Sequence, residues 1–464
     1  MRVRGFFRGA LMLCLLAWVA ATSLARQREP TDAYAARRAR LRAQVDGPVV
    51  LFAFTGREDA SPSYVFNQEE NFYYLTGHNE PGAALLLLPE PPAGKTFDGP
   101  REILFLPARN LSRERWDGPR IGPEDANVQQ ATGFAAVLPS DRLRGELERA
   151  AKVFSNFHTL LPGRNEAGYP HRQNWLKWLE ENVPGVRFHN VMPALAAMRQ
   201  VKTPTELKLL ERAIEVSVDA HLAAMRMMRP GLYEYQVAAR MEYVHKAAGC
   251  EREGYAPIVG AGFNSTVLHY NALSALIQPG DVVVLDVGAQ CDGYVADITR
   301  TLPASGKFTP RQREVYEIVL GAQNAVLAAL RPGMTLGGTD EKSLNRIARE
   351  YMDRFKDKDG QPMSRHFIHG LGHHVGLNVH DASVPGPLQP GMVLTIEPGL
   401  YIPEEKLGVR IEDIVLVTPD GYKLLTARLP RAVAEMEKLL GRPRRAAAAR
   451  PPDPVTGRLP HAGR

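Results

Sequence analysis

An internal repeat constrains the fold of this chain more than any other feature of its sequence. Residues 278–288 read QPGDVVVLDVG, and residues 389–399 read QPGMVLTIEPG. Each copy has Gln-Pro-Gly, then an apolar run typical of a strand, then an acid eight residues after the glutamine, Asp286 or Glu397. A Pro-Gly pair before a strand is common, so the turn alone would not indicate duplication.

The same order extends to the flanking segments. One histidine lies 17 residues before each acid, His269 in the first copy and His380 in the second. Each copy also has a predicted helix with a Thr-Pro start and an Arg-Pro-Gly end, over residues 203–231 and 309–333. Together these features predict two related halves of roughly 110 residues, packed about a pseudo-twofold axis.

Two pairs of facing carboxylates follow from the repeat. A hairpin centred near residue 291.5 would put Asp286 opposite Asp297. A loop over residues 403–408 would put Glu397 opposite Glu412. Facing side chains stand about 4.5–5.5 Å apart at Cβ, where two like charges raise a pKa or bind a cation. One such pair would more often be a solvated surface, but two symmetry-related pairs predict a site for about two divalent cations.

The stretch HGLGHHVGLNVHD, residues 369–381, supplies imidazoles for such a site. Four of the 13 histidines lie in it: His369, His373, His374 and His380. From spacing alone His369 and His373 form a candidate metal-binding pair, whereas the repeat ties His380 to His269 as a substrate-side pair. Four carboxylates and one imidazole are hard, oxygen-rich donors, which favour Mn²⁺, Co²⁺, Fe²⁺ or Zn²⁺ over metals that prefer thiolate.

Four segments are expected along the chain. Residues 1–25 are a predicted signal peptide with a basic start, an apolar stretch and small residues before a cleavage site. Residues 31–195 predict a mixed α/β domain from runs such as VVLFAF and EILFLP, and residues 200–430 hold the repeat. Residues 441–464 are rich in Pro, Arg and Ala and predict a disordered tail.

The N-terminal pattern predicts export to the periplasm or the extracellular space. Its apolar run of about 12 residues is shorter than the roughly 20 of a spanning helix, which disfavours an uncleaved anchor. No other run is apolar enough for stable membrane insertion. Of the formal net charge of +6, residues 1–25 carry +3 and residues 431–464 carry +5. The remainder therefore carries −2, which argues against a nucleic-acid partner.

Two cysteines lie beyond the predicted signal peptide, Cys250 and Cys291. They form no Cys-x-x-Cys motif, so two free thiols or one optional disulfide are favoured over a catalytic or zinc-binding role. Export would permit a disulfide, but the sequence leaves both alternatives open.

Five motifs resemble the creatinase/aminopeptidase metallopeptidases, the pita-bread family of methionine aminopeptidase, prolidase and aminopeptidase P. They are LHY (268–270), LDVGAQCDGYVADITR (285–300), HGLGHHVGLNVHD (369–381), TIEPGLYI (395–402) and GVRIED (408–413). Residues 64–89 and 113–122 resemble the N-terminal domain of aminopeptidase P, which methionine aminopeptidases lack. The resemblance implies an α/β protein, with a mixed N-terminal domain followed by a pseudo-twofold pita-bread catalytic domain.

The resemblance implies five metal ligands: Asp286, Asp297, His373, Glu397 and Glu412. Asp286 resembles a terminal ligand of one metal, and Asp297 and Glu412 resemble carboxylates that bridge both. His373 and Glu397 resemble ligands of the second metal. Two divalent cations are therefore expected, with Mn²⁺ favoured over Co²⁺, Fe²⁺ or Zn²⁺.

Further residues resemble the family's catalytic and substrate-binding groups. Glu397 resembles the general acid–base, and His380 and His269 resemble histidines that contact the substrate and stabilise the tetrahedral intermediate. His369, Arg410 and Tyr401 match or adjoin the pocket for the proline ring. Trp116 resembles a tryptophan that, in tetrameric relatives, reaches a neighbouring subunit's active site. His374 matches no assigned role.

The implied activity is hydrolysis of the Xaa-Pro bond at a peptide N-terminus, by attack of a metal-bridging hydroxide on the carbonyl. Peptides with proline in second position are the expected partners, and the enzyme is expected to be a homodimer or homotetramer. Two alternatives remain: a strict Xaa-Pro dipeptidase, that is a prolidase, and a non-catalytic pita-bread binding module. The complete set of ligand-competent residues disfavours the second alternative.

Overall fold

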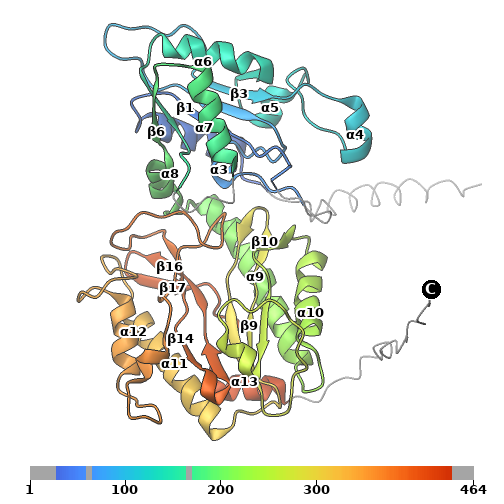
Figure 1. The fold of residues 1–464 in the computed structure, drawn as a ribbon, viewed down its shortest axis with the longest axis vertical. Helices are drawn as coiled ribbons and strands as arrows, with labels where there is room; N and C mark the ends of the chain where they lie inside the picture. Colours follow the sequence, from blue (N-terminus) through green and yellow to red (C-terminus); the bar gives the residue numbers. More distant parts are fainter. Residues whose placement is uncertain (1–27, 59–64, 164–169, 442–464) are drawn as a thin grey trace, which may run out of the picture.

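The computed structural model describes residues 28–58, 65–163 and 170–441. The predicted signal peptide, residues 1–25, and the predicted tail beyond Gly441 lie outside the described residues. The chain folds into two parts, one above the other in Figure 1. The upper part ends with α8 (Met192–Arg199), and α9 (Pro204–Met227) opens the lower part. The structure thus has the predicted α/β class, with a mixed first domain before a pita-bread domain.

The first part is built on a six-stranded mixed sheet with the order β4-β3-β2-β1-β5-β6. Its strands are β1 (Val49–Phe52), β2 (Ala84–Leu87), β3 (Glu102–Leu106), β4 (Ala136–Pro139), β5 (Asn156–Thr159) and β6 (Arg187–Asn190). Its other helices are α2 (Thr31–Arg42), α3 (Glu70–Thr76), α4 (Leu111–Asp117), α5 (Val128–Thr132), α6 (Leu143–Ala151) and α7 (Pro170–Asn182), with the 3₁₀ turn η1 (Ser140–Arg142). Runs such as VVLFAF and EILFLP form strands, as predicted.

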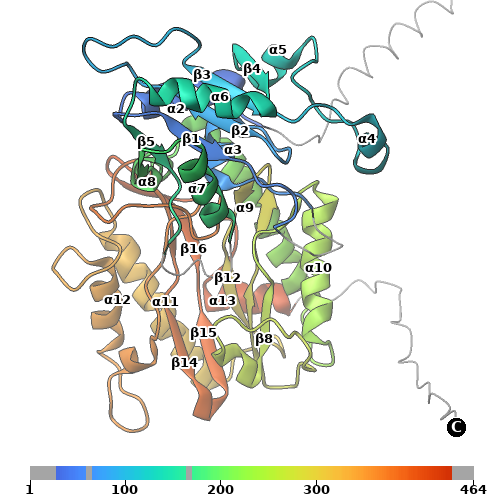
Figure 2. The same ribbon diagram turned by 45° about the horizontal axis from the view of Figure 1, so that its top comes forward.

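Helices cover both faces of this sheet because its strands are apolar on both sides. Val50 and Phe52 of β1 join a core with α6 and α7, which Figure 2 shows in front of the sheet. Val49 and Leu51, which alternate with them, join the larger core that continues into the second part. Such continuous apolar strands are typical of a sheet buried on two faces.

The second part contains the two halves that the repeat predicts. The first half has α9, α10 (Glu234–Ala247), β7 (Arg252–Glu253), β8 (Ile258–Ala261), η2 (Gly262–Thr266), β9 (Val282–Asp286), β10 (Ala289–Cys291), β11 (Tyr294–Val295) and β12 (Thr299–Pro303). The second half has α11 (Pro310–Ala329), α12 (Leu344–Met352), η3 (Met363–His366), β13 (Val393–Ile396), β14 (Gly399–Ile402), η4 (Pro403–Glu405), β15 (Leu407–Arg410), β16 (Asp413–Thr418) and β17 (Gly421–Leu424). A last helix, α13 (Val433–Leu440), follows.

Each half has a pair of packed helices outside its strands. Helices α9 and α10 pack together on one side, and α11 and α12 pack together on the other (Figure 1). Helices α9 and α11 both begin with the predicted threonine-proline capping box, at Thr203 and Thr309. At the centre, an antiparallel bridge between Thr299 and Glu412 joins the strands of the two halves. The symmetry therefore brings the acid-bearing strand ends together.

The predicted register is correct in the second half and wrong in the first. Ile396 pairs with Asp413 and Gly399 pairs with Arg410, so Glu397 and Glu412 stand opposite each other in register, as predicted. In the first half, however, Asp286 pairs with Thr299 rather than facing Asp297. The turn is Asp292-Gly293, whose φ angles of 54° and 85° form a two-residue hairpin loop one residue later than expected.

No helix within the described ranges is long and apolar enough to cross a bilayer.

Candidate metal and substrate site

One cavity of about 500 Å³ lies in the second part, next to the strand ends that carry the predicted carboxylate ligands. Of the residues singled out in the sequence, it is lined by His269, Asp286, Asp297, His369, His373, His380, Glu397, Arg410 and Glu412. Tyr401 lies behind its wall and contacts two of the lining residues. Trp116 is on α4 of the first part, where it is 90% exposed and lines no part of this cavity.

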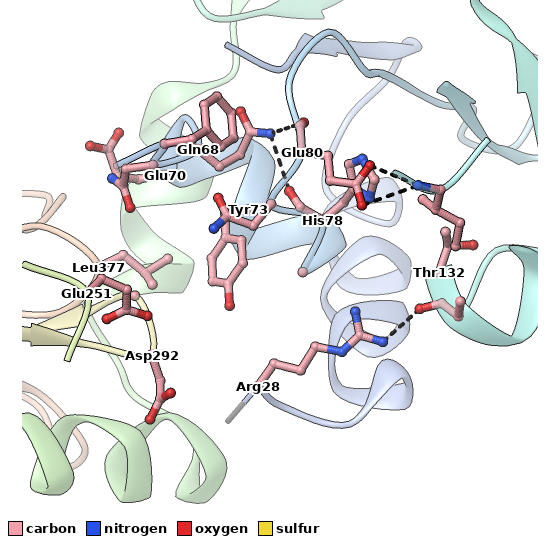
Figure 3. Close-up of a pocket in the computed structure, with 17 residues that line it drawn as sticks. Arg28, Gln68, Glu70, Tyr73, His78, Glu80, Thr132, Glu251, Asp292 and Leu377 are labelled. Atoms are coloured by element: carbon pink, nitrogen blue, oxygen red, sulfur yellow. Dashed lines mark hydrogen bonds between the residues drawn. The ribbon is translucent and has the colours of Figure 1, made fainter. Parts of the chain in front are cut away.

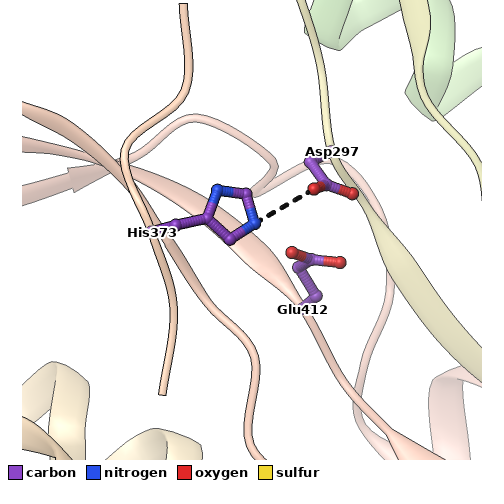
Figure 4. Close-up of side chains that lie close together, drawn as sticks. All are labelled: Asp297, His373 and Glu412. Carbon is purple, nitrogen blue, oxygen red and sulfur yellow. Dashed lines mark ion pairs between the residues drawn. The ribbon is translucent and has the colours of Figure 1, made fainter. Parts of the chain in front are cut away.

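Asp297, His373 and Glu412 form a compact cluster in this cavity (Figure 4). One ligand atom from each residue lies within 4.8 Å of the others. The His373 Nε2 atom is 3.3 Å from Asp297 Oδ2 and 3.3 Å from Glu397 Oε1. Three different strand or loop segments thus direct donors toward one point, as a metal site requires.

Local hydrogen bonds orient the His373 ring. Its backbone N–H donates to Thr395 Oγ1 at 3.0 Å, which fixes the loop against β13. Its Nδ1 lies 3.1 Å from the carbonyl oxygen of His374, so Nδ1–H donates and Nε2 is left facing the carboxylates. A hydrogen bond of this kind, made by the ring nitrogen that faces away from the metal, sets the tautomer of metal-binding histidines.

The carboxylates of this cluster repel one another, and a cation among them would relieve this repulsion. Glu412 Oε1 is buried and has no hydrogen-bond partner in the described part of the chain. Burial, together with Asp297 and Glu397, raises the pKa of Glu412 well above its usual range. Burial and the neighbouring Asp286 likewise raise the pKa of Asp297. A buried anionic oxygen without a donor, among further carboxylates and one imidazole, matches the donor set of hard divalent metals.

The surroundings of the cluster raise the pKa values of two residues, Glu397 and His373. Burial raises the pKa of Glu397 to about 7, with Asp297 adding to the rise and His373 opposing it. Burial lowers the pKa of His373, but Asp297 and Glu397 outweigh it and bring the value to about 9. In the metal-free protein Glu397 therefore exchanges its proton near neutral pH.

Asp286 and Asp297 are joined by a residue that the sequence did not reveal. The Tyr255 hydroxyl lies 2.6 Å from Asp286 Oδ1 and 2.6 Å from Asp297 Oδ1. It brings together two carboxylates that do not face each other in the hairpin register. Arg410 Nη2 donates to the other oxygen of Asp286, Oδ2, at 2.7 Å.

The predicted proline-pocket residues form a connected group. Arg410 Nη1 donates to the Tyr401 hydroxyl at 2.8 Å, and this hydroxyl lies 2.8 Å from His369 Nε2. His369 Nδ1 lies 2.8 Å from the carbonyl oxygen of Gly370. Burial, aided by Arg410, lowers the pKa of His369 to about 4, so the ring is neutral at pH 7. Because Nδ1–H of the neutral ring donates to Gly370, Nε2 accepts a hydrogen bond from the Tyr401 hydroxyl.

His269 and His380 both line the cavity, as the repeat predicts for a substrate-side pair. The His380 ring packs edge-on against His373 with centroids 4.2 Å apart. Burial, and then the neighbouring His373 and His269, lower the pKa of His380. A neutral imidazole at this position can donate one hydrogen bond toward a substrate oxygen.

Three supporting residues were missed from sequence: Tyr255, Thr299 and Thr395. Thr299 donates to Glu412 Oε2 at 2.7 Å, and Thr395 donates to Glu397 Oε1 at 3.1 Å. Both threonines lie in quoted motifs, two residues after Asp297 and two before Glu397, so same-face alternation on a strand could have indicated them. Tyr255 lies 31 residues before Asp286, and no local pattern connects the two.

Comparisons with known proteins agree with this geometry. Residues 208–419 match the model of metallopeptidase family M24, and residues 34–158 match that of the aminopeptidase P N-terminal domain. The chain is 33% identical to the Xaa-Pro aminopeptidase of Haemophilus influenzae, over 89% of this chain and 97% of that protein. It is 32% identical to the Xaa-Pro aminopeptidase of Escherichia coli, over 82% and 90% respectively.

Solved structures show the same similarity. The aminopeptidase PepP of Pseudomonas aeruginosa superimposes with a TM-score of 0.76 and 32% identity, over 89% of this chain and 98% of that one. Proline aminopeptidase P II from Yersinia pestis gives 0.76 and 30%, over 89% and 99%.

Fold and site together define a metal-dependent peptidase of the pita-bread class. The chain belongs to metallopeptidase family M24, in its Xaa-Pro aminopeptidase (aminopeptidase P) branch.

Proposed function

We propose that this protein is an exported dinuclear aminopeptidase that releases the first residue from peptides with proline in second position. The observation that carries the proposal is the convergence of five ligand-competent residues and a proline-pocket group in one cavity of about 500 Å³. Asp286, Asp297, His373, Glu397 and Glu412 would hold two divalent cations, with Mn²⁺ the favoured metal. When bound, the cations supply Lewis-acid polarisation and lower the pKa of a water that they hold.

The chain's own residues would direct the reaction. Glu397 would accept a proton from the attacking water and deliver it to the leaving proline nitrogen. His380 and His269 face the cavity and donate hydrogen bonds to the oxygen that gains charge. The free α-amino group of the peptide lies on the carboxylate side of the cavity, which sets the register of cleavage.

The proline ring would be recognised by shape rather than by hydrogen bonding. Proline has no backbone N–H and a fixed φ, so a specialised pocket must accept its ring without offering an acceptor. His369, Tyr401 and Arg410 are hydrogen-bonded to one another, and Arg410 also donates to Asp286 and Thr299. This group therefore presents a rigid, prearranged wall to the ring.

The decisive experiment compares peptide classes. Release of the first residue is measured from Xaa-Pro-Yaa tripeptides, from Xaa-Pro dipeptides and from Xaa-Ala-Yaa controls, with Mn²⁺ present. The proposal expects the Xaa-Pro-Yaa series to be cleaved best. Turnover of dipeptides alone would identify the alternative, a strict prolidase. A wild-type protein that binds no divalent cation, measured beside Asp297→Ala, would leave only the alternative of a non-catalytic binding module.

Export and assembly are separate parts of the proposal. Export rests on the sequence pattern of residues 1–25 and predicts a mature chain that starts at Arg26 in the periplasm or medium. N-terminal sequencing of fractionated cells tests it.

Assembly as a dimer or tetramer rests on the exposed Trp116, which would reach the site of a neighbouring subunit. Sedimentation of the wild type and Trp116→Ala tests it.

A further inference from the structure

The first part of the chain contacts the histidine loop, residues 369–381, through the start of α3. Asn378 Nδ2 donates to Glu70 Oε1 at 3.2 Å. The next residue of α3, Asn71, accepts a hydrogen bond at Oδ1 from Arg199 Nη1 at 2.8 Å. Arg199 ends α8, which is the last element before the second part.

Arg199 continues this contact to the far end of the histidine loop. It pairs with the carboxylate of Asp381, and Lys202 Nζ donates to the other oxygen, Oδ2, at 2.8 Å. The Asp381 side chain is only 2% exposed, so the charged groups of Arg199 and Lys202 replace the water that would otherwise solvate it. The Asp381 N–H also donates to the carbonyl oxygen of His374 at 2.8 Å. Such a buried, fully paired carboxylate has one stable position.

Asp381 directly follows His380, so its position fixes where the His380 backbone runs. The His380 ring packs against the His373 ring 4.2 Å away. The middle of the loop is equally constrained, because a Cβ at Gly376 would lie 2.3 Å from Asp381 Oδ2. One chain of contacts thus runs from Asn71 through Arg199 and Asp381 to the imidazole that faces the substrate cavity.

A cavity of about 330 Å³ lies beside this chain of contacts (Figure 3). Glu70 from α3, Leu377 from the histidine loop and Asp292 from the hairpin turn all line it. Leu377 also belongs to the apolar core that includes Phe72 and Leu75 of α3. The polar contacts of Glu70 and Asn71 add a directional link to this packing.

We propose that Asn71 and Arg199 are positioning residues: through Asp381 they make the first domain hold His380 in its catalytic place. The kinetic consequence rests on the proposed function, because it assumes that His380 contacts the reacting peptide. The structural consequence, a loop held by the first domain, does not depend on any activity.

The test compares two asparagines of the first part: Asn71, whose partner Arg199 pairs with Asp381 in the second part, and Asn67, whose partner Gln290 itself lies in the second part. Asn71→Ala removes the acceptor for Arg199, whereas Asn67→Ala, the matched control, removes the acceptor for Gln290 Nε2, also at 2.8 Å. Each change is made in the wild type and in His380→Ala, and melting temperature and metal content are measured for all. We expect Asn71→Ala to lower kcat for Xaa-Pro-Yaa peptides roughly fivefold, as for one lost hydrogen bond, with little change in KM.

The His380→Ala background separates positioning from general damage. If Asn71 acts through His380, Asn71→Ala has no further effect on kcat in that background. An equal loss in both backgrounds, or no loss in either, would overturn the proposal. A general structural role would also lower activity in the Asn67→Ala control or reduce metal content in parallel.

Hydrogen exchange gives a readout that needs no substrate. Amides of residues 374–381 are expected to exchange faster in Asn71→Ala than in the wild type, and unchanged in Asn67→Ala. Unchanged protection of this segment in Asn71→Ala overturns the inference even if the enzyme is inactive. A wild type without Xaa-Pro turnover contradicts the proposed function alone, and the exchange result still decides whether the first domain holds the loop.

Discussion

Arg410 donates a hydrogen bond to Asp286, with Nη2 2.7 Å from Oδ2, so a residue predicted to line the proline pocket contacts a predicted metal ligand. If Asp286 holds a cation as proposed, the guanidinium competes with that cation for the carboxylate. We therefore expect Arg410→Met to tighten binding of the Asp286-held cation by roughly tenfold, well within the Coulomb energy of a close pair. Isothermal titration with Mn²⁺ measures it.

The same variant should raise KM for Xaa-Pro peptides, because Tyr401 loses the donor that orders the pocket wall. Arg428→Met is the matched control, since Arg428 pairs with Glu215 at the surface. Unchanged or weaker metal binding in Arg410→Met would show that Arg410 and the metal do not compete.

The stability of the metal-free protein should fall as pH rises from about 7 to 9. Glu397 and Glu412 have folded-state pKa values raised above those of an unfolded chain, to about 7 for Glu397. A carboxyl with a raised pKa stabilises the fold below its unfolded pKa, and this contribution is lost as pH rises through the folded value. The raised pKa of His373, about 9, has the same sign, because its stabilising charge is lost as pH rises through 9.

Between pH 7 and 9 the other buried histidines do not oppose this loss of stability. Burial lowers the pKa of His221 to about 3 and of His374 to about 4, and both gain stability with rising pH only up to the unfolded value near 6.5. Melting temperatures of chelator-treated protein test the prediction. Glu412→Gln should flatten the slope and lose bound metal, and a melting temperature that rises across this window would contradict it.

Tyr255→Phe should weaken metal binding by roughly 10–100-fold, as for other residues that orient ligands. Its hydroxyl is the shared neighbour of Asp286 and Asp297, at 2.6 Å from each. Without it the two carboxylates lose the group that holds them in one arrangement. Titration with buffered Mn²⁺ measures the change. Tyr270→Phe serves as control, since its hydroxyl donates to Glu234 instead, and equal losses in both variants would argue against a specific role.

The sequence predicted the parts of the site that follow from local repetition. The acids at Asp286 and Glu397 are carried by two copies of one motif, so the strands, the capped helices and the meeting of the halves were all predictable. The register of the first hairpin was not, because either one of two adjacent turns fits the letters around Cys291. Only the positive φ of Asp292 and Gly293 selects the two-residue loop.

Contacts between distant segments were beyond the reach of the sequence. Tyr255 joins two carboxylates from a loop with no motif of its own. Asn71 and Arg199 are 128 residues apart in the chain, and no periodicity encodes their hydrogen bond. Tyr255 lines the cavity beside the predicted ligands, whereas Asn71 and Arg199 act on the histidine loop from outside the cavity.

Arg300→Met should destabilise the protein by about 3–5 kcal/mol, the cost of leaving a buried charge unpaired. Arg300 Nη2 lies 2.6 Å from Asp413 Oδ1, and both side chains are fully buried. Arg300 also donates to the carbonyl oxygens of Thr299 and Glu412, so it joins the central strands of the two halves. Urea unfolding measures the change, and Arg428→Met at the surface should cost less than about 1 kcal/mol. Equal costs for the two variants would contradict the buried pair's role.

Reduction should destabilise the protein without altering its site. Cys250 and Cys291 form a disulfide that closes a span of 41 residues between the end of α10 and β10, which resolves the alternative left open by the sequence. Loop-closure entropy predicts a loss of about 3–4 kcal/mol on reduction. Neither cysteine lines the substrate cavity, so kcat measured well below the unfolding transition should be unchanged. Urea midpoints with and without reductant give the loss, and Cys250→Ala/Cys291→Ala should show no dependence on reductant. A wild type whose midpoint does not depend on reductant, under conditions that release two thiols, would show that the covalent link contributes nothing to stability.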